Sequence, residues 1–141
     1  MKSTDFCCLA TVDPKGVWSN PVYFAWDANF NVYFISQLPS RHMQNIQNDP
    51  RVAMSIYTTE QKEDAIGIQL EGEAEILQDE GRSRAAFEIY FGRAGKGEDV
   101  QRYLNDPTWL IARVHPTTIS YFDTRFFGEE RQVVPWEKVR I

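Results

Sequence analysis

The chain has 141 residues, 43% hydrophobic and 25% charged, values typical of one globular domain and not of a disordered or fibrous protein. Fifteen basic and twenty acidic residues give a formal net charge of −5, which argues against a surface that binds nucleic acid by general phosphate attraction. We therefore expect a single domain over residues 1–141 with no nucleic-acid partner.

Apolar and β-branched segments separated by turn residues predict a succession of strands. The predicted strands are residues 6–12, 18–26, 32–36, 52–57, 65–77, 109–114, 118–122 and, in the tail, about 132–134. The first three are separated by short turns and predict an antiparallel meander. Pro21 lies inside the second of them and cannot donate to a ladder, so we expect a sheet edge, a bulge or a place where a ligand approaches the backbone.

Three short helical segments interrupt these strands. Ser40 is placed to cap a helix that stops at Asn48-Asp49-Pro50, and a second helix is predicted from about Asp79 to Phe91, ended by Gly92. A further turn or two is predicted around residues 100–104. At least six strands with two or three short helices predict a mostly β protein built as a small, mostly antiparallel barrel.

The strand predicted at residues 65–77 shows a period of two. Ile68, Leu70, Gly72, Ala74 and Ile76 alternate with Gln69, Glu71, Glu73 and Glu75. This alternation is typical of a strand with one buried and one solvated face. We therefore interpret the three glutamates as a solvated sheet face and not as a catalytic carboxylate pair.

The cysteines and the apolar runs indicate the cellular location of the protein. Cys7 and Cys8 are adjacent, so they cannot join distant parts of the fold, and we expect them to be reduced and packed. No apolar run approaches the roughly 18 residues of a membrane span, and the N-terminus lacks the pattern of a secretory signal. These features predict a cytoplasmic protein without membrane contact.

Common catalytic signatures are missing from the sequence. It contains no G-x-S-x-G, no G-x-x-x-x-G-K-[ST] and no G-x-G-x-x-G after a strand. His42 and His115 are the only histidines, and neither has a second histidine or cysteine at a ligand spacing, so we expect no zinc site. No catalytic residue is assigned.

Residues 32–46 run from a strand end through a turn into a helix start. Backbone N–H groups at a helix N-terminus attract anions, the Ser36 and Ser40 hydroxyls can donate hydrogen bonds, and Arg41 can hold two phosphate oxygens. The same residues also fit an ordinary capped helix with a surface arginine. Local evidence leaves both interpretations open.

Six segments then occur in a characteristic order over about residues 6–77. They are Leu9–Asp13 with Gly16, Asn20–Phe24, Val32–Ser36, Ser40–His42, Asp49–Ala53 and Glu71–Glu75. In this order and spacing the chain resembles the pyridoxamine phosphate oxidase-like FMN-binding split-barrel family. From Trp109 onward it looks like a small, poorly characterised branch of that superfamily.

The resemblance implies a split β-barrel of Greek-key-like antiparallel strands, assembled as a homodimer with one FMN at each of two sites between the subunits. By position, it places Asn20, Pro21 and Val22 beside the isoalloxazine ring and Ile35 and Ser36 at the end of the next strand.

The phosphate-binding pair of the family corresponds to Arg41 and His42, with Ser40 beside them. The family often has lysine where His42 stands and a basic residue where Asn20 stands. Gln69 lies two residues beyond the position of a ring-contacting glutamine, and therefore on the same strand face.

The implied function is an FMN-dependent oxidoreductase with an unknown small-molecule substrate. Residues 125–131 lack the histidine-containing motif with which the oxidase binds its substrate, so vitamin oxidation is not supported. Three alternatives stay open: a non-catalytic flavin-binding or sensing module, a deazaflavin in place of FMN, and a haem-binding split barrel using His42 or His115.

Overall fold

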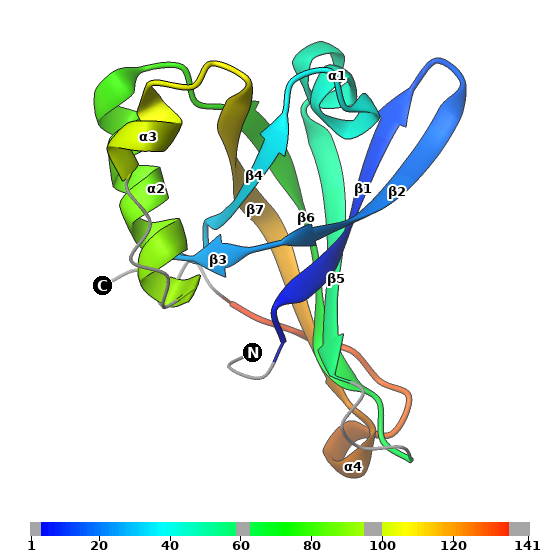
Figure 1. The fold of residues 1–141 in the computed structure, drawn as a ribbon. Helices are drawn as coiled ribbons and strands as arrows, with labels where there is room; N and C mark the ends of the chain where they lie inside the picture. The colour runs from blue at the N-terminus through cyan, green and yellow to red at the C-terminus, as the bar shows by residue number, and fades with distance from the viewer. Residues whose placement is uncertain (1–3, 59–62, 95–99, 136–141) are drawn as a thin grey trace.

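The computed structural model describes residues 4–58, 63–94 and 100–135, which form a curled antiparallel sheet with short helices around it (Figure 1). The strands are β1 (Phe6–Asp13), β2 (Gly16–Tyr23), β3 (Ala25–Trp26), β4 (Val32–Gln37), β5 (Arg51–Thr58), β6 (Ile66–Ile76), β7 (Trp109–Asp123) and β8 (Gln132–Val133). The helices are α1 (Arg41–Asn48), α2 (Glu80–Ala94), α3 (Val100–Leu104) and α4 (Thr124–Phe127). The mostly β split-barrel prediction is confirmed, although the described residues contain four helices and not two or three.

The second predicted strand is divided at Phe24. The strand order is β2-β1-β5-β6-β7-β4-β3, with β8 added beside β7, so β2 and β3 lie at opposite edges of the sheet. Phe24 between them is fully buried, and the β2–β3 segment crosses in front of the sheet from one edge to the other (Figure 1). The predicted meander therefore consists of two hairpins, and Pro21 lies on an edge strand as expected.

The two strands predicted on either side of residues 115–117 are a single strand, β7. It pairs with β6, β4 and β8, and its pairing with β6 shifts register between Glu71 and Gly72. Pro116 is fully buried beside this bulge, where a residue without an N–H is tolerated. The turn that the sequence indicated here is a bulge inside one long strand.

Two apolar cores lie on the two faces of the curled sheet. The first fills the inside of the half-barrel and includes Leu9, Phe34, Met43 and Val114. The second lies under α2 and α3 and is made by residues such as Phe87 and Phe91 packed on Tyr33 and Ile111.

The alternation along β6 is confirmed, because Leu70, Gly72 and Ala74 are buried while Gln69, Glu71 and Glu73 are exposed. Glu75 differs from the predicted solvated face. Its carboxylate forms ion pairs with Arg82, at 2.6 Å, and with Arg113. The sheet face is therefore open to solvent at Glu71 and Glu73 but partly covered by α2 at Glu75.

Helix α2 passes through Gly92 and continues to Ala94, so the predicted end at Gly92 is wrong. The additional turn brings Arg93 over the Trp26 ring at 3.6 Å and the Phe24 ring at 4.6 Å, and Arg93 donates to the Thr4 carbonyl at 2.9 Å. These contacts favour the longer helix over termination at glycine. No helix among the described residues has both the length and the apolar character to cross a membrane.

We expect replacement of two glycines by alanine to have opposite effects on stability. A Cβ at Gly72 would overlap the His115 carbonyl oxygen across the bulge, whereas a Cβ at Gly92 meets open space on α2. We expect Gly72→Ala to lower the free energy of unfolding by about 1–3 kcal/mol and Gly92→Ala to raise it by about 0.5–1 kcal/mol. Urea unfolding of both variants checks this, and equal effects would contradict the bulge geometry.

Candidate functional site

The end of β4 and the start of α1 bring three polar side chains together. The His42 Nε2 atom lies 2.8 Å from the Ser36 Oγ and 3.4 Å from the Ser40 Oγ, and the two serine oxygens are 3.3 Å apart. His42 is 5% exposed, and burial lowers its pKa. The imidazole is therefore neutral at pH 7, and the cluster offers hydroxyl and imidazole hydrogen bonds without a charge.

The N-terminus of α1 is not capped by a side chain. Ser40 stands at the N-cap position with an extended backbone, as predicted, but its hydroxyl donates to the Gln37 carbonyl at 2.7 Å. The amides of the first helical turn receive no hydrogen bond from it. Such amides carry partial positive charge and are suited to an anion.

Arg41 is fixed by the tip of the β1–β2 hairpin. Its Nε donates to the Asp13 carboxylate at 2.9 Å, and its guanidinium carbon lies 4.5 Å from the centre of the Trp18 ring. The bond from Arg41 lowers the pKa of Asp13, so this carboxylate is ionised. Only Nε takes part in this ion pair, and the side chain is 39% exposed, so its terminal nitrogens can approach a ligand.

A buried amide connects the same helix to β1. Asn45 is 4% exposed and lies 2.9 Å from the Thr11 Oγ1. In the amide orientation that satisfies both ends, its nitrogen also donates to the Arg41 carbonyl and to Asp13. Asn45 therefore holds the helix against the hairpin that positions Arg41.

The strand residues that we expected beside the isoalloxazine ring have different environments. Pro21 is exposed, Asn20 is half-buried with its amide donating to the Pro21 carbonyl at 3.0 Å, and Val22 is buried in the first core. Ile35 packs against the second core, so its side chain points away from Ser36. Val22 and Ile35 can offer backbone atoms only.

Gln69 lies on the other face of the sheet. Its neighbours across the strands are Ser55 and Ser120, and its Oε1 accepts from Arg131 Nε at 3.2 Å. The structure therefore separates Gln69 from the group of Ser36, Ser40, Arg41 and His42, which it does bring together.

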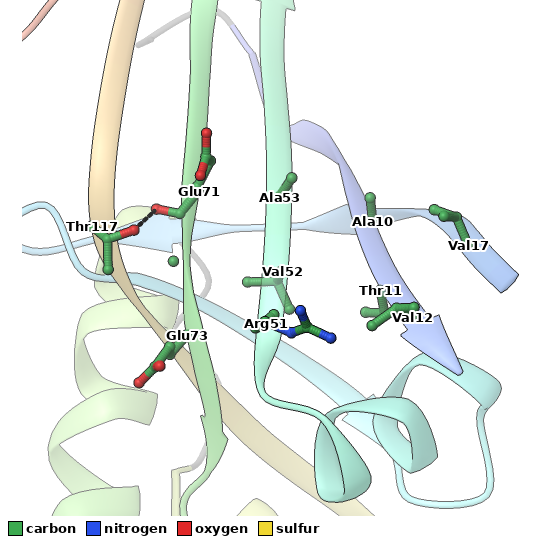
Figure 2. A pocket seen from close by; sticks show the side chains of 11 residues that line it. Ala10, Thr11, Val12, Val17, Arg51, Val52, Ala53, Glu71, Glu73 and Thr117 are labelled. Carbon is green, nitrogen blue, oxygen red and sulfur yellow. Dashed lines mark hydrogen bonds between the residues drawn. The ribbon is translucent and has the colours of Figure 1, made fainter. Parts of the chain in front are cut away.

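The face that carries Gln69 is hollowed by two adjoining pockets with volumes of about 520 and 430 Å³. Ala10, Ala53 and Glu71 line both, so they form one groove across β1, β5 and β6, which we call the outer groove. Figure 2 shows its 520 Å³ part, with Arg51 and the two carboxylates Glu71 and Glu73 around small side chains. Small residues on adjacent strands let a flat group approach the sheet closely.

Metal and thiol chemistry find little support here. Over residues 4–58, 63–94 and 100–135, no three His, Cys, Asp or Glu side chains are grouped as metal ligands. Cys7 and Cys8 are free thiols, and burial raises the pKa of Cys7 to about 12, so that thiol is protonated.

Sequence reasoning missed three residues that touch the candidate site residues: Asp13 and Trp18 beside Arg41, and Arg131 beside Gln69. Asp13 ends one of the segments that carry the family resemblance, but no pattern indicated that the hairpin tip would reach α1. Arg131 lies 62 residues beyond Gln69, and only the folded chain brings the two together.

Comparison with known proteins agrees with this architecture. Residues 1–122 match the family model described as Pyridoxamine 5'-phosphate oxidase, and the chain has no match among curated proteins.

Solved structures that share the fold at low identity include the following three. A conserved hypothetical protein from Mycobacterium tuberculosis is 21% identical with a TM-score of 0.75, covering 94% of this chain and 86% of that chain. The General Stress Protein 26 of Bacillus anthracis is 20% identical with a TM-score of 0.64, covering 93% and 90%. A heme binding protein from Mycobacterium smegmatis is 17% identical with a TM-score of 0.76, covering 97% of this chain and 55% of that chain.

The lowered pKa of His42 predicts a pH dependence of stability. Because the unfolded histidine has a pKa of about 6.5, the unfolded chain binds the proton first as the pH falls. We expect the free energy of unfolding to be fully retained above about pH 6.5 and to decrease as the pH falls through the lower folded pKa. Urea unfolding between pH 5 and 8 should show a shallower dependence on pH for His42→Gln than for the parent protein. An identical slope for His42→Gln and the parent would contradict this assignment.

Proposed function

The chain belongs to the pyridoxamine 5'-phosphate oxidase family, and on this basis we propose that it is a cytoplasmic FMN-binding flavoprotein that oxidises or reduces a small molecule. The observation that carries the proposal is the group of Ser36, Ser40 and Arg41 at the uncapped N-terminus of α1. Two hydroxyls, free amides and a guanidinium are the donors that a terminal phosphate requires.

These donors fit the phosphate of FMN by their chemistry. The Ser36 hydroxyl and the first-turn amides can donate hydrogen bonds, the Ser40 hydroxyl can do so once it leaves the Gln37 carbonyl, and Arg41 contributes the positive charge. Stacking on Trp18 and pairing with Asp13 hold the guanidinium in place before the ligand arrives, which reduces the entropy lost on binding. His42 orients Ser36 through their 2.8 Å hydrogen bond.

When bound, FMN would supply a ring nitrogen that accepts or donates hydride. The protein's part is to hold the phosphate at α1, to place strand backbone at Asn20–Val22 along the ring, and to leave one ring face open to a substrate. Deazaflavin would need the same phosphate contacts.

The candidate phosphate site carries little net positive charge to attract an anion. The Asp13 carboxylate offsets Arg41, and His42 is neutral. Affinity for the phosphate must therefore come mainly from oriented hydrogen bonds and the helix N-terminus, which contribute less than a second cation would.

A homodimer explains how Gln69 joins the same ligand. Ser36 lies on the sheet face of Phe34, inside the half-barrel, whereas Gln69 lies on the face opposite to Leu70. One copy cannot turn both side chains toward a single flat ring. In a dimer the outer groove of one copy, with its small side chains, brings Gln69 to the flavin held by the other.

Pyridoxamine 5'-phosphate is not proposed as the substrate. Arg125, a basic residue of the C-terminal motif region, donates from Nε and Nη2 to the buried Asp123 carboxylate at 2.9 and 2.7 Å. That pairing makes Arg125 a structural residue.

Haem is less well supported than flavin, although one structural neighbour is a heme binding protein. His42 is buried with its Nε2 bonded to Ser36, and the His115 Nδ1 lies 3.0 Å from the Asn31 amide oxygen. Neither histidine lines the outer groove.

FMN titration followed by flavin fluorescence tests the phosphate site. We expect Arg41→Ala to weaken FMN binding by about 1.5–3 kcal/mol, roughly 10- to 150-fold, and Asp13→Asn to strengthen it by removing the opposing charge. Arg84→Ala on α2 is the matched control and should leave the affinity unchanged. Retention of FMN by Arg41→Ala at parent affinity would remove Arg41 from the site, and a Soret band with haem but no retained flavin would overturn the flavin proposal.

Ser55 in the outer groove tests the composite site, because it neighbours Gln69 across the strands. We expect Ser55→Arg to produce a monomer by light scattering and to lose FMN, although the residues at α1 are untouched. Ala85→Arg on the exposed side of α2 changes the charge by the same amount and should remain a dimer that binds FMN. A monomeric parent protein that binds FMN would contradict the shared site.

A further inference from the structure

A second cavity opens in the first core, at the end of the half-barrel away from α1. Its volume is about 170 Å³. It is lined by Trp26, Phe30, Val32, Ile56, Ile68, Leu70, Ile119, Tyr121 and Val134. Val32 begins β4 and Ser36 lies near its end, so this cavity and the phosphate cluster occupy opposite ends of the barrel interior.

The lining excludes charged and strongly polar ligands. Tyr121 is the only lining side chain with an oxygen, and its hydroxyl lies 2.8 Å from the Asp123 carboxylate, to which it donates. The other side-chain polar atom is the indole nitrogen of Trp26, a donor only. Water in such a space lacks the two to four polar partners that would hold it, so the cavity favours an apolar occupant.

The turn between β3 and β4 places Phe30 in the lining of the cavity. Phe30 has a φ of +62°, a left-handed conformation that residues with a side chain rarely adopt. Its amide donates to the Asp27 carbonyl at 3.1 Å, while the Asp27 carboxylate accepts from the amides of Asn29 and Asn31 at 2.8 and 3.0 Å. These bonds hold Phe30 in an otherwise unfavourable backbone conformation, a feature that often marks ligand sites.

We propose that this cavity binds a small, neutral, apolar molecule about the size of one aromatic ring. A dry cavity of about 150 Å³ with an aliphatic and aromatic lining is known to hold benzene, and this one is similar in size and lining. The inference does not depend on flavin, because none of the lining residues belongs to the phosphate cluster or to the outer groove apart from Leu70, whose side chain faces the core.

The test uses the full chain and two probes that share a benzene ring, neutral toluene and charged benzylammonium. Toluene should raise the midpoint of thermal unfolding by several degrees and change the tryptophan fluorescence, because Trp26 lines the cavity. Benzylammonium should do neither, since the cavity offers its charge no partner.

Neighbouring valines provide a matched pair of variants. Val134 lines the cavity, whereas Val133 is 70% exposed. Val134→Phe should fill part of the space and weaken toluene binding at least tenfold, and Val133→Phe should bind toluene as the parent does. Ile68→Phe, which fills the cavity from β6, provides a second loss-of-binding variant if Val134→Phe fails to fold. The proposal is overturned if toluene leaves the parent midpoint unchanged, or if it stabilises both valine variants equally.

Discussion

The pairing of β6 with β7 is the interaction on which the remaining structure depends. It extends from Ile66 to Ile76 and bends at the bulge by Gly72, where the His115 carbonyl leaves no room for a side chain. Because β7 also pairs with β4, the same strand positions the start of α1. The end of the protein where we propose phosphate binding therefore inherits its geometry from a bulge that is not itself part of the proposed site.

The opposite charges of Asp13 and Arg41 determine which ligands the start of α1 can bind. A hairpin tip that brings Asp13 to Arg41 gives a rigid guanidinium but offsets part of the positive charge that an anion would meet. The buried, neutral His42 adds hydrogen bonding without charge. The site is well ordered and weakly cationic, which favours a ligand with many hydrogen-bond acceptors over one recognised by charge alone.

The sequence predicted the strands well where the apolar period was clear. Alternation in β6 and the apolar run of β4 indicated both their existence and, for β6, the buried face. Prediction from the sequence failed where tertiary contacts override local signals. Gly92 indicates a helix end, but the stacking of Arg93 on Trp26 extends α2 past it, and Pro116 indicates a break that the bulge absorbs. In the candidate site, Ser36, Ser40, Arg41 and His42 lie together because they are close in sequence, whereas Asp13 and Arg131 reach Arg41 and Gln69 only through folding.

The β4–β7 ladder also has a consequence for how the chain folds. It joins Val32 to Val114 and Gln37 to Trp109, so the two halves of the barrel meet through contacts very distant in sequence. Closing such long loops costs entropy before any contact repays it, which slows folding. During synthesis the edge of β4 that pairs with β7 stays unpaired until β7 has left the ribosome. An unpaired apolar strand is prone to aggregation, so the nascent chain carries that hazard for most of its translation.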